Sequence, residues 1–252
     1  LDSGIIPSGV ERFGLTDGAL DHEPEGELKA ILDRPWPNLR SFIAPANWLY
    51  PKGAALVWEL LAKSSVRELD LSRNSIGWGA GFLRDAGPRK LRILRFAGNH
   101  VEARGTRAVA GASFLDTVER VDSLRAIHLG SNHLGPEGAK ALSRCRWMAK
   151  LAELDLSDNQ LRDEGAGHVG KALGDRLRAL GLEGNLLGAD TGAHLATSAA
   201  RVSLAWLEMS RNSLGAAGLA EFAAAGVDVA ALAATLQSDG ADAFVKSWKH
   251  LI

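Results

Sequence analysis

The chain has 252 residues, of which 46% are hydrophobic, so it can bury a sizeable core in one large domain or two small ones. Its formal net charge of −1 argues against a broad nucleic-acid or membrane surface, which would need a basic excess. The single cysteine, Cys145, excludes an internal disulfide and a cysteine-rich zinc cluster, and fits a reducing compartment.

Targeting signals are not evident in the sequence. No apolar run reaches the roughly 18 residues needed to span a bilayer, and no secretory signal is present. The chain begins at Leu1 rather than at methionine, so we expect a processed chain or a fragment. We expect it in the cytoplasm, with a secreted effector as the alternative.

The N-terminal segment, residues 1–38, is predicted to be a degenerate repeat or cap. It contains "VERFGLTDGAL" from Val10, a weak copy of the repeat that follows, with Gly18 at the position of a recurring asparagine. It continues with "EPEGELKAILDRPWPNL", in which three prolines interrupt a helical pattern.

A repeat dominates residues 39–225. Its frame is L-x-x-L-x-L-x-x-N-x-L, and a clear copy is "LAELDLSDNQL" from Leu151. Other copies begin at Leu39, Val66, Leu91, Leu124, Leu177 and Leu204. The recurring asparagines are Asn47, Asn74, Asn99, Asn132, Asn159, Asn185 and Asn212, with spacings of 27, 25, 33, 27, 26 and 27 residues. With the N-terminal copy we expect eight repeats, covering about residues 10–225.

Each unit combines two periodicities. The first half alternates, as in Leu154-Asp155-Leu156, which predicts a short strand with one buried face. The second half begins near a glycine and continues in good helix formers, for example "GAKALSRC". A strand and a helix repeated every 27 residues or so predict an α/β solenoid. We expect a curved horseshoe with a parallel sheet on its concave face and helices on its convex face.

The frame resembles that of leucine-rich repeat proteins, and the glycine-marked, helix-bearing unit resembles their ribonuclease-inhibitor-like subclass. The style of "LDLSDNQLRDEGA" is also similar to repeats common in bacterial proteins. The alternating cysteines of the ribonuclease inhibitors themselves are missing. The resemblance implies the fold, but the subclass includes inhibitors, sensors, GTPase activators and effectors, so it does not decide the function.

The recurring asparagine is predicted to be structural. A strand that turns into a loop leaves backbone N–H and C=O groups inside the stack, and an amide side chain can both donate to and accept from them. In proteins that the repeat resembles, this residue forms a ladder between neighbouring units. We therefore expect Asn159 and its counterparts to form such a ladder.

Two segments break the repeat. Residues 226–252 lack the frame, and Phe244, Val245 and Trp248 in them follow helical spacing, so we expect a C-terminal helical cap. The same helix could instead dock a partner. Residues 111–123 account for the 33-residue spacing and are predicted to lengthen a helix or loop on the convex side, either as a binding loop or as a tolerated bulge.

The candidate binding site is the concave face of the predicted sheet. Residues that flank the buried leucines should form a surface about 34 Å long, because strands lie about 4.8 Å apart. A mixed patch of charges with an exposed tryptophan is typical of a protein-binding face; the alternative is a solvated sheet without a partner. The candidate residues are Glu68, Asp70, Arg95, His128, Glu153, Asp155, Glu183, Trp206 and Glu208.

Chemistry beyond binding is not predicted. His100, His128 and His133 fall in neighbouring repeats, but the third ligand that a zinc site needs is not obvious, so we expect no metal. Cys145 has no supported base and is expected to pack in an outer helix. We find no catalytic constellation, and expect neither enzymatic activity nor a cofactor.

Three functions compete. The first is a scaffold that binds a protein through its concave face, without nucleic-acid or membrane contact. The second, implied by the resemblance, is a GTPase activator. Such proteins usually carry an acidic tail, whereas this chain ends in "KSWKHLI". The third is a ligand-sensing repeat fragment of a larger sensor or effector. Neither the partner nor the oligomeric state follows from the sequence.

Overall fold

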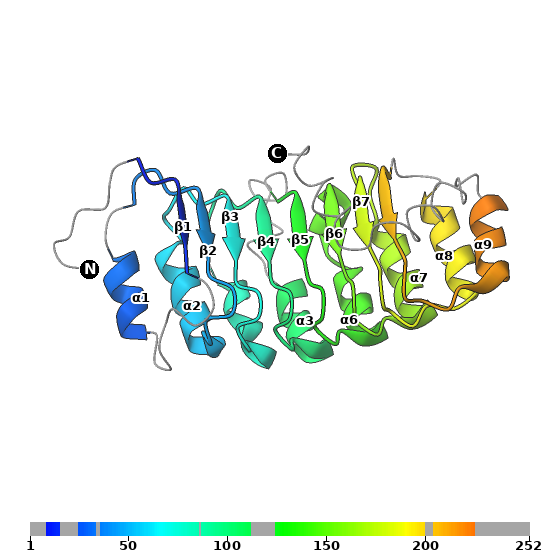
Figure 1. Cartoon of the computed structure of the whole chain (residues 1–252), viewed down its shortest axis with the longest axis horizontal. Coiled ribbons are helices and arrows are strands. Elements are labelled where there is room, and N and C mark those ends of the chain that lie inside the picture. Colours follow the sequence, from blue (N-terminus) through cyan, green and yellow to red (C-terminus); the bar gives the residue numbers. More distant parts are fainter. Residues whose placement is uncertain are drawn as a thin grey trace.

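Short strands alternate with helices along the described repeats (Figure 1), as seen in a computed structural model of the protein. The structure describes residues 9–15, 25–33, 36–85, 87–111, 124–199 and 204–224. The strands are β1 (Arg12–Gly14), β2 (Ser41–Ile43), β3 (Glu68–Asp70), β4 (Ile93–Arg95), β5 (Ala126–His128), β6 (Glu153–Asp155), β7 (Ala179–Gly181) and β8 (Trp206–Glu208). The α-helices are α1 (Glu25–Leu32), α2 (Tyr50–Leu60), α3 (Glu102–Ala110), α6 (Gly135–Leu142), α7 (Arg162–Ala172), α8 (Asp190–Ala199) and α9 (Gly215–Ala224). The described residues also form the 3₁₀ helices η1 (Gly77–Arg84) and η2 (Arg146–Lys150).

The described strands form one parallel sheet. It has eight strands in the order β1 to β8, each paired with the strand of the next repeat. The middle residues stand opposite one another, as Leu69 does to Leu94 and Leu154 to Leu180. This register confirms the predicted α/β solenoid, since the same frame position lies at the same depth in every repeat.

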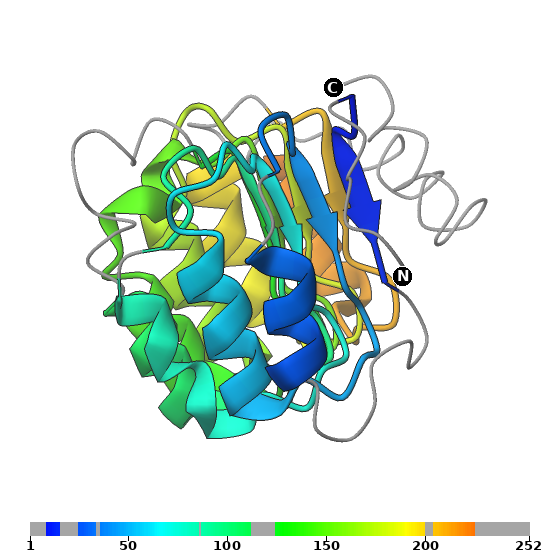
Figure 2. The same ribbon diagram turned by 90° about the vertical axis from the view of Figure 1, so that its left-hand side faces the viewer.

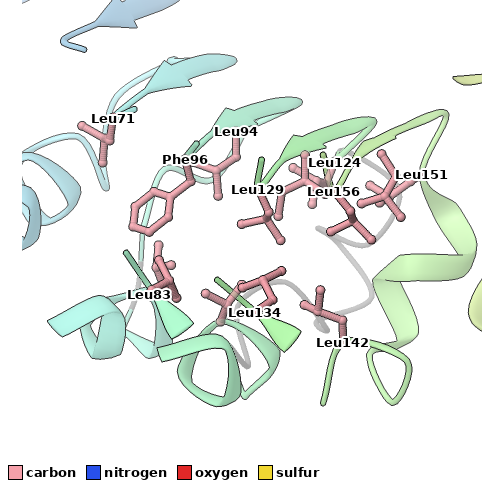
Figure 3. Packing of buried hydrophobic residues seen from close by; sticks show 14 of the residues in the cluster. Leu71, Leu83, Leu94, Phe96, Leu124, Leu129, Leu134, Leu142, Leu151 and Leu156 are labelled. Carbon is pink, nitrogen blue, oxygen red and sulfur yellow. The ribbon is translucent and has the colours of Figure 1, made fainter. Parts of the chain in front are cut away.

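The protein has two layers with the core between them. Figure 2 shows the helices on one side and the sheet on the other. In Figure 3, Leu94, Phe96 and Leu156 on the sheet side face Leu83 and Leu142 on the helix side. All five are fully buried. The other face of the sheet carries the side chains on either side of each middle residue.

The helical half of the third repeat differs from the expected α-helix. It forms the 3₁₀ helix η1, whose sequence "GWGAGFLR" contains Gly77, Gly79 and Gly81. Glycine weakens an α-helix because it loses the most backbone freedom on folding. Gly79 also lies so close to Pro51 of α2 that a Cβ atom there would collide with the proline ring. Close packing and low helix propensity together explain the tighter helix.

The recurring asparagines donate hydrogen bonds to backbone carbonyls of two repeats. The Nδ2 atom of Asn159 lies 2.9 Å from the carbonyl oxygen of Leu129 in the preceding repeat. It also lies 2.9 Å from that of Leu156 and 3.0 Å from that of Ser157 in its own turn. One amide thereby satisfies carbonyl groups that the core would otherwise leave without partners.

The same side chains also accept hydrogen bonds. The Oδ1 atom of Asn159 accepts the backbone N–H groups of Asn132 at 3.0 Å and Leu134 at 3.3 Å. Corresponding bonds link Asn47, Asn74, Asn99, Asn132, Asn159, Asn185 and Asn212 into a continuous ladder. The ladder holds consecutive turns at one spacing, and so positions the strands that carry the candidate site.

The predicted boundaries of the two caps and the central repeat can be compared with the structure only where the residues are described. Within residues 1–38, β1 pairs with β2 like any other strand of the sheet. The predicted C-terminal cap, residues 226–252, lies outside the described residues, as do Gly18 and residues 112–123 of the long repeat. The division into two caps and a central repeat therefore stays a prediction.

Candidate functional site

The face of the sheet that is turned away from the helices, which we call the concave face, carries two rows of side chains, from the first and the third residue of each strand. The first-position row is Arg12, Ser41, Glu68, Ile93, Ala126, Glu153, Ala179 and Trp206. The third-position row is Gly14, Ile43, Asp70, Arg95, His128, Asp155, Gly181 and Glu208. All of the candidate residues except Glu183 belong to these rows.

Glu68 is the centre of a polar cluster that spans three strands. The hydroxyl of Ser41 on β2 donates to its Oε2 atom at 2.6 Å, and Arg95 on β4 forms an ion pair with its Oε1 atom. Burial by itself would raise the pKa of Glu68. The hydrogen bonds from Ser41 and Arg95, with the positive charges of Arg95 and Arg12, outweigh burial and lower that pKa below its ordinary value. Glu68 is therefore held as a carboxylate at neutral pH.

A second pair joins β5 and β6. The Nε2 atom of His128 lies 2.9 Å from the Oε1 atom of Glu153, and both side chains are buried. A buried polar side chain is tolerated when a partner satisfies it. Sequence spacing placed these two residues in adjacent strands, but only the structure shows them in contact.

Three carboxylates of the third-position row hold the turns that follow their strands. Asp70 accepts the backbone N–H of Ser72 at 2.9 Å, and Asp155 accepts that of Ser157 at the same distance. Glu208 accepts the N–H of Ser210 at 2.8 Å in the same way. An acidic residue followed by serine two positions later is a sequence signal for such a turn. These residues therefore have a structural role in addition to facing the concave side.

The strand-and-helix units and their asparagine ladder agree with known sequence families. A family model described as "Leucine Rich repeat" matches residues 123–143 and 148–167, which contain β5 with α6 and β6 with the start of α7. The chain therefore contains leucine-rich repeats, and its sheet and helices have the α/β solenoid arrangement of that fold. Leucine-rich repeats are in general protein-binding folds rather than enzymes.

Part of the chain is similar to the Tonsoku-like protein of Bos taurus. The two are 42% identical over 93 residues, which is 35% of this chain. The match covers 6% of the bovine protein, so the chain corresponds to a small part of that relative's length. The similarity therefore supports the presence of the repeat in this chain. It does not extend to the activity of the whole bovine protein.

Two candidate residues differ from their expected setting. Trp206 was expected to be exposed on the concave face, but it is partly buried. Glu183 does not lie on a strand: it lies in the turn after β7 and pairs with Arg211 at 3.3 Å. Glu183 stands two residues beyond the strand, at a position where the chain has already left the sheet.

Exposed aromatic side chains lie in another part of the protein, in and near the segments that lead from strand to helix. Trp48, Tyr50 and Trp78 expose 51%, 42% and 58% of their surfaces. The Nε1 atom of Trp78 donates to Glu102 at 2.9 Å, and the guanidinium of Arg104 lies 5.2 Å from the ring centroid. Sequence reasoning missed these residues, although Trp48 directly follows a ladder asparagine, a position that points away from the core.

The histidines after the ladder asparagines stack on one another. The rings of His100 and His133 lie 5.6 Å apart with an interplanar angle of 13°, and Gln160 lies 3.1 Å from the Nδ1 atom of His133. In the described part of the chain, no group of three or more His, Cys, Asp or Glu side chains is placed to hold a metal ion. Cys145 lies between α6 and η2 rather than inside a helix, and is buried.

Among the helices in the described ranges, none has the length and hydropathy that crossing a membrane requires.

Proposed function

We propose that this protein is a scaffold that binds another protein through its concave face. The observation that carries the proposal is the set of cross-strand pairs on that face, with Glu68 held by Ser41 and Arg95, and Glu153 held by His128. Side chains already fixed before binding lose little conformational freedom when a partner docks, which favours affinity.

The composition of the face indicates the kind of partner. Acidic side chains outnumber arginines in the two rows, and Ile43, Ile93 and Trp206 add apolar surface that is partly exposed. Charge complementarity increases the rate and specificity of association, while aromatic and aliphatic groups supply most of the affinity. A protein segment that combines basic with apolar side chains fits this face best.

The repeat also supports a finer classification. The unit length of about 27 residues and the helix in each unit favour the ribonuclease-inhibitor-like subclass. We include this subclass in the proposal, because its wide helical layer opens the sheet into a concave surface that accommodates a protein partner.

The test compares capture by the wild type with capture by the triple variant Asp70→Asn, Asp155→Asn, Trp206→Ala. Asparagine removes the charge of each aspartate but keeps an oxygen that can accept the N–H of Ser72 or Ser157. The turns should therefore survive, and equal melting temperatures would check this. Proteins captured from native lysate would be identified by mass spectrometry, purified, and titrated against both forms.

The control is Arg107→Glu, which changes the charge by two units at an exposed position on α3 in the helical layer. A partner that binds the wild type and Arg107→Glu but loses at least about tenfold in affinity for the triple variant supports the proposal. Equal binding to all three forms would move the site away from the concave face. If Trp206→Ala lowers stability, the double variant Asp70→Asn, Asp155→Asn provides the comparison.

A further inference from the structure

A row of arginines runs along the edge at which the strands begin. The residue immediately before the strand is Arg40 in the second repeat, Arg67 in the third, Arg92 in the fourth and Arg125 in the fifth. We call these four residues the arginine row. Arg40, Arg92 and Arg125 are exposed, and Arg67 is partly exposed. Neither of the rows on the concave face includes them.

Backbone hydrogen bonds hold the arginine row in register. The N–H of Arg67 donates to the carbonyl oxygen of Arg40, that of Arg92 to Arg67 and that of Arg125 to Arg92, each at 2.7 Å. Adjacent strands lie about 4.8 Å apart, so the four Cα atoms span about 14 Å. The arginines thus form a continuous line of positive charge on a rigid support.

The positive charges of the arginine row are not paired with acidic side chains in the described part of the structure. No hydrogen bond or ion pair within the described ranges holds the guanidinium group of any of the four arginines. Arg95, by contrast, is paired with Glu68 on the concave face. Like charges on neighbouring strands repel one another and destabilise a sheet. An anionic ligand would relieve this repulsion.

The neighbouring loops extend the positive field. Arg89 and Lys90 lie just before β4, and Arg144, Arg146 and Lys150 lie between α6 and β6. These loops end at the same edge of the sheet, because each leads from a helix to the start of a strand. Although the net charge of the whole chain is only −1, this edge carries a local basic excess.

The surroundings of the row favour an acidic protein segment over a nucleic acid. Binding of single-stranded nucleic acid relies on aromatic side chains on which bases stack. In the described helix-to-strand loops, Trp147 is fully buried and Trp36 packs against Phe13 with ring centroids 4.8 Å apart. Next to Arg92 stands Ile93, which is partly exposed and offers contact to an apolar side chain.

We propose that the arginine row binds an extended acidic segment of a partner protein, with carboxylates paired to the guanidinium groups. The planar guanidinium donates two parallel hydrogen bonds to a carboxylate, which lysine cannot do. Ile93 belongs to the concave face as well, but the four arginines do not, so the proposal stands whether or not that face binds a protein.

The test titrates a short fluorescein-labelled, glutamate-rich peptide containing one leucine, followed by fluorescence anisotropy. The variant is Arg92→Glu, Arg125→Glu, and the control with the same change in net charge is Lys52→Glu, Arg107→Glu at exposed positions of α2 and α3. We expect binding by the wild type that weakens with added salt. We expect a loss of about tenfold or more in the arginine variant and little change in the control.

Other outcomes would overturn the proposal. These are absence of peptide binding by the wild type, an equal loss in both double variants, or equal binding of the peptide with glutamine in place of glutamate. Tighter binding of a labelled poly-dT strand than of the peptide would assign the row to nucleic acid instead. If charge reversal disturbs folding, Arg92→Gln, Arg125→Gln replaces it. The concave triple variant should bind the peptide like the wild type, which separates this proposal from the proposed function.

Discussion

The side-chain oxygen of Asn159 accepts the backbone N–H of Asn132 at 3.0 Å, so one amide joins the turns of two successive repeats. Asn159 also donates to a carbonyl of the preceding repeat and to two of its own turn. Each repeat is therefore joined to its neighbour by side-chain hydrogen bonds as well as by the sheet. A destabilising substitution in one repeat should therefore also destabilise the neighbouring repeats.

Removal of this asparagine should destabilise the fold. We expect Asn159→Ala to lower the free energy of unfolding by about 1–3 kcal/mol, because the fully buried turn loses the partner of several backbone groups. Urea denaturation measures this change. The control is Gln160→Ala at the exposed neighbouring position, which should change the free energy of unfolding much less, because its contact with His133 is exposed. Equal stability of Asn159→Ala and Gln160→Ala would refute the structural role.

The Glu68–Arg95 pair predicts a pH-dependent contribution to stability. The pKa of Glu68 is lowered in the folded state, so its ionised form stabilises the fold above the ordinary glutamate pKa, and this contribution is lost as the pH falls below it. Arg95→Gln should therefore destabilise the protein by about 1–2 kcal/mol at neutral pH.

The difference between wild type and Arg95→Gln should shrink as the pH falls from 6 towards 3, a range around the ordinary glutamate pKa of about 4.3. Thermal melts of both proteins across this range measure it. Arg67→Gln serves as the control, because no ion pair holds Arg67 within the described part of the chain. A gap between wild type and Arg95→Gln that stays constant with pH would show that the arginine acts through packing alone.

Two substitutions of Asp155 test whether the turn after β6 needs a negative charge or only a hydrogen-bond acceptor. Asp155 accepts the backbone N–H of Ser157 at 2.9 Å and its hydroxyl at 2.6 Å. We expect Asp155→Asn to keep most of the stability and Asp155→Ala to lose about 1 kcal/mol, because only alanine lacks the accepting oxygen. Differential scanning calorimetry of the two variants decides this. A larger loss for asparagine than for alanine would contradict the turn assignment.

Close approach of two helices predicts opposite effects of the same substitution at two glycines. Gly192 in α8 packs so closely on α9 that a Cβ atom would collide with the carbonyl oxygen of Gly218. A Cβ atom at Gly26 in the exposed part of α1 meets no atom within 4 Å. Gly192→Ala should therefore lower the melting temperature.

Gly26→Ala should raise stability by about 0.5–1 kcal/mol, since alanine is the better helix former. Thermal melts followed by circular dichroism compare both variants with the wild type. If both substitutions stabilised the protein, α8 and α9 would not be in close contact in solution.

Much of the architecture was predictable because a repeat makes each residue's environment periodic. The frame around Leu154 and Asn159 indicated strand, turn and helix, and the eight parallel strands follow that prediction in register. The 3₁₀ helix η1 was not predicted. Its glycines were visible in the sequence, but the contact between Gly79 and Pro51 joins two repeats and follows only from how the helices pack.

The candidate face was predictable in position but not in detail. Spacing alone assigned Glu68 and Arg95 to neighbouring strands, because the side-chain alternation of a strand does not depend on distant residues. Glu183 was assigned to the face of the sheet, but it lies in the turn after β7. The strands have only three residues, so an error of two residues in the predicted end of a strand places a side chain outside the sheet. Trp206 is partly buried, and the accessibility of a side chain depends on everything around it.

The sequence by itself determined the repeat, the core leucines and the asparagine positions, because hydrophobic period and backbone hydrogen bonding act locally and recur in each unit. Only the tertiary structure decided which charges meet. It paired Arg95 with Glu68 and His128 with Glu153, and it brought Arg40, Arg67, Arg92 and Arg125 into one row at the start of their strands. These contacts join residues more than twenty positions apart, and their geometry depends on the register between repeats rather than on any local pattern.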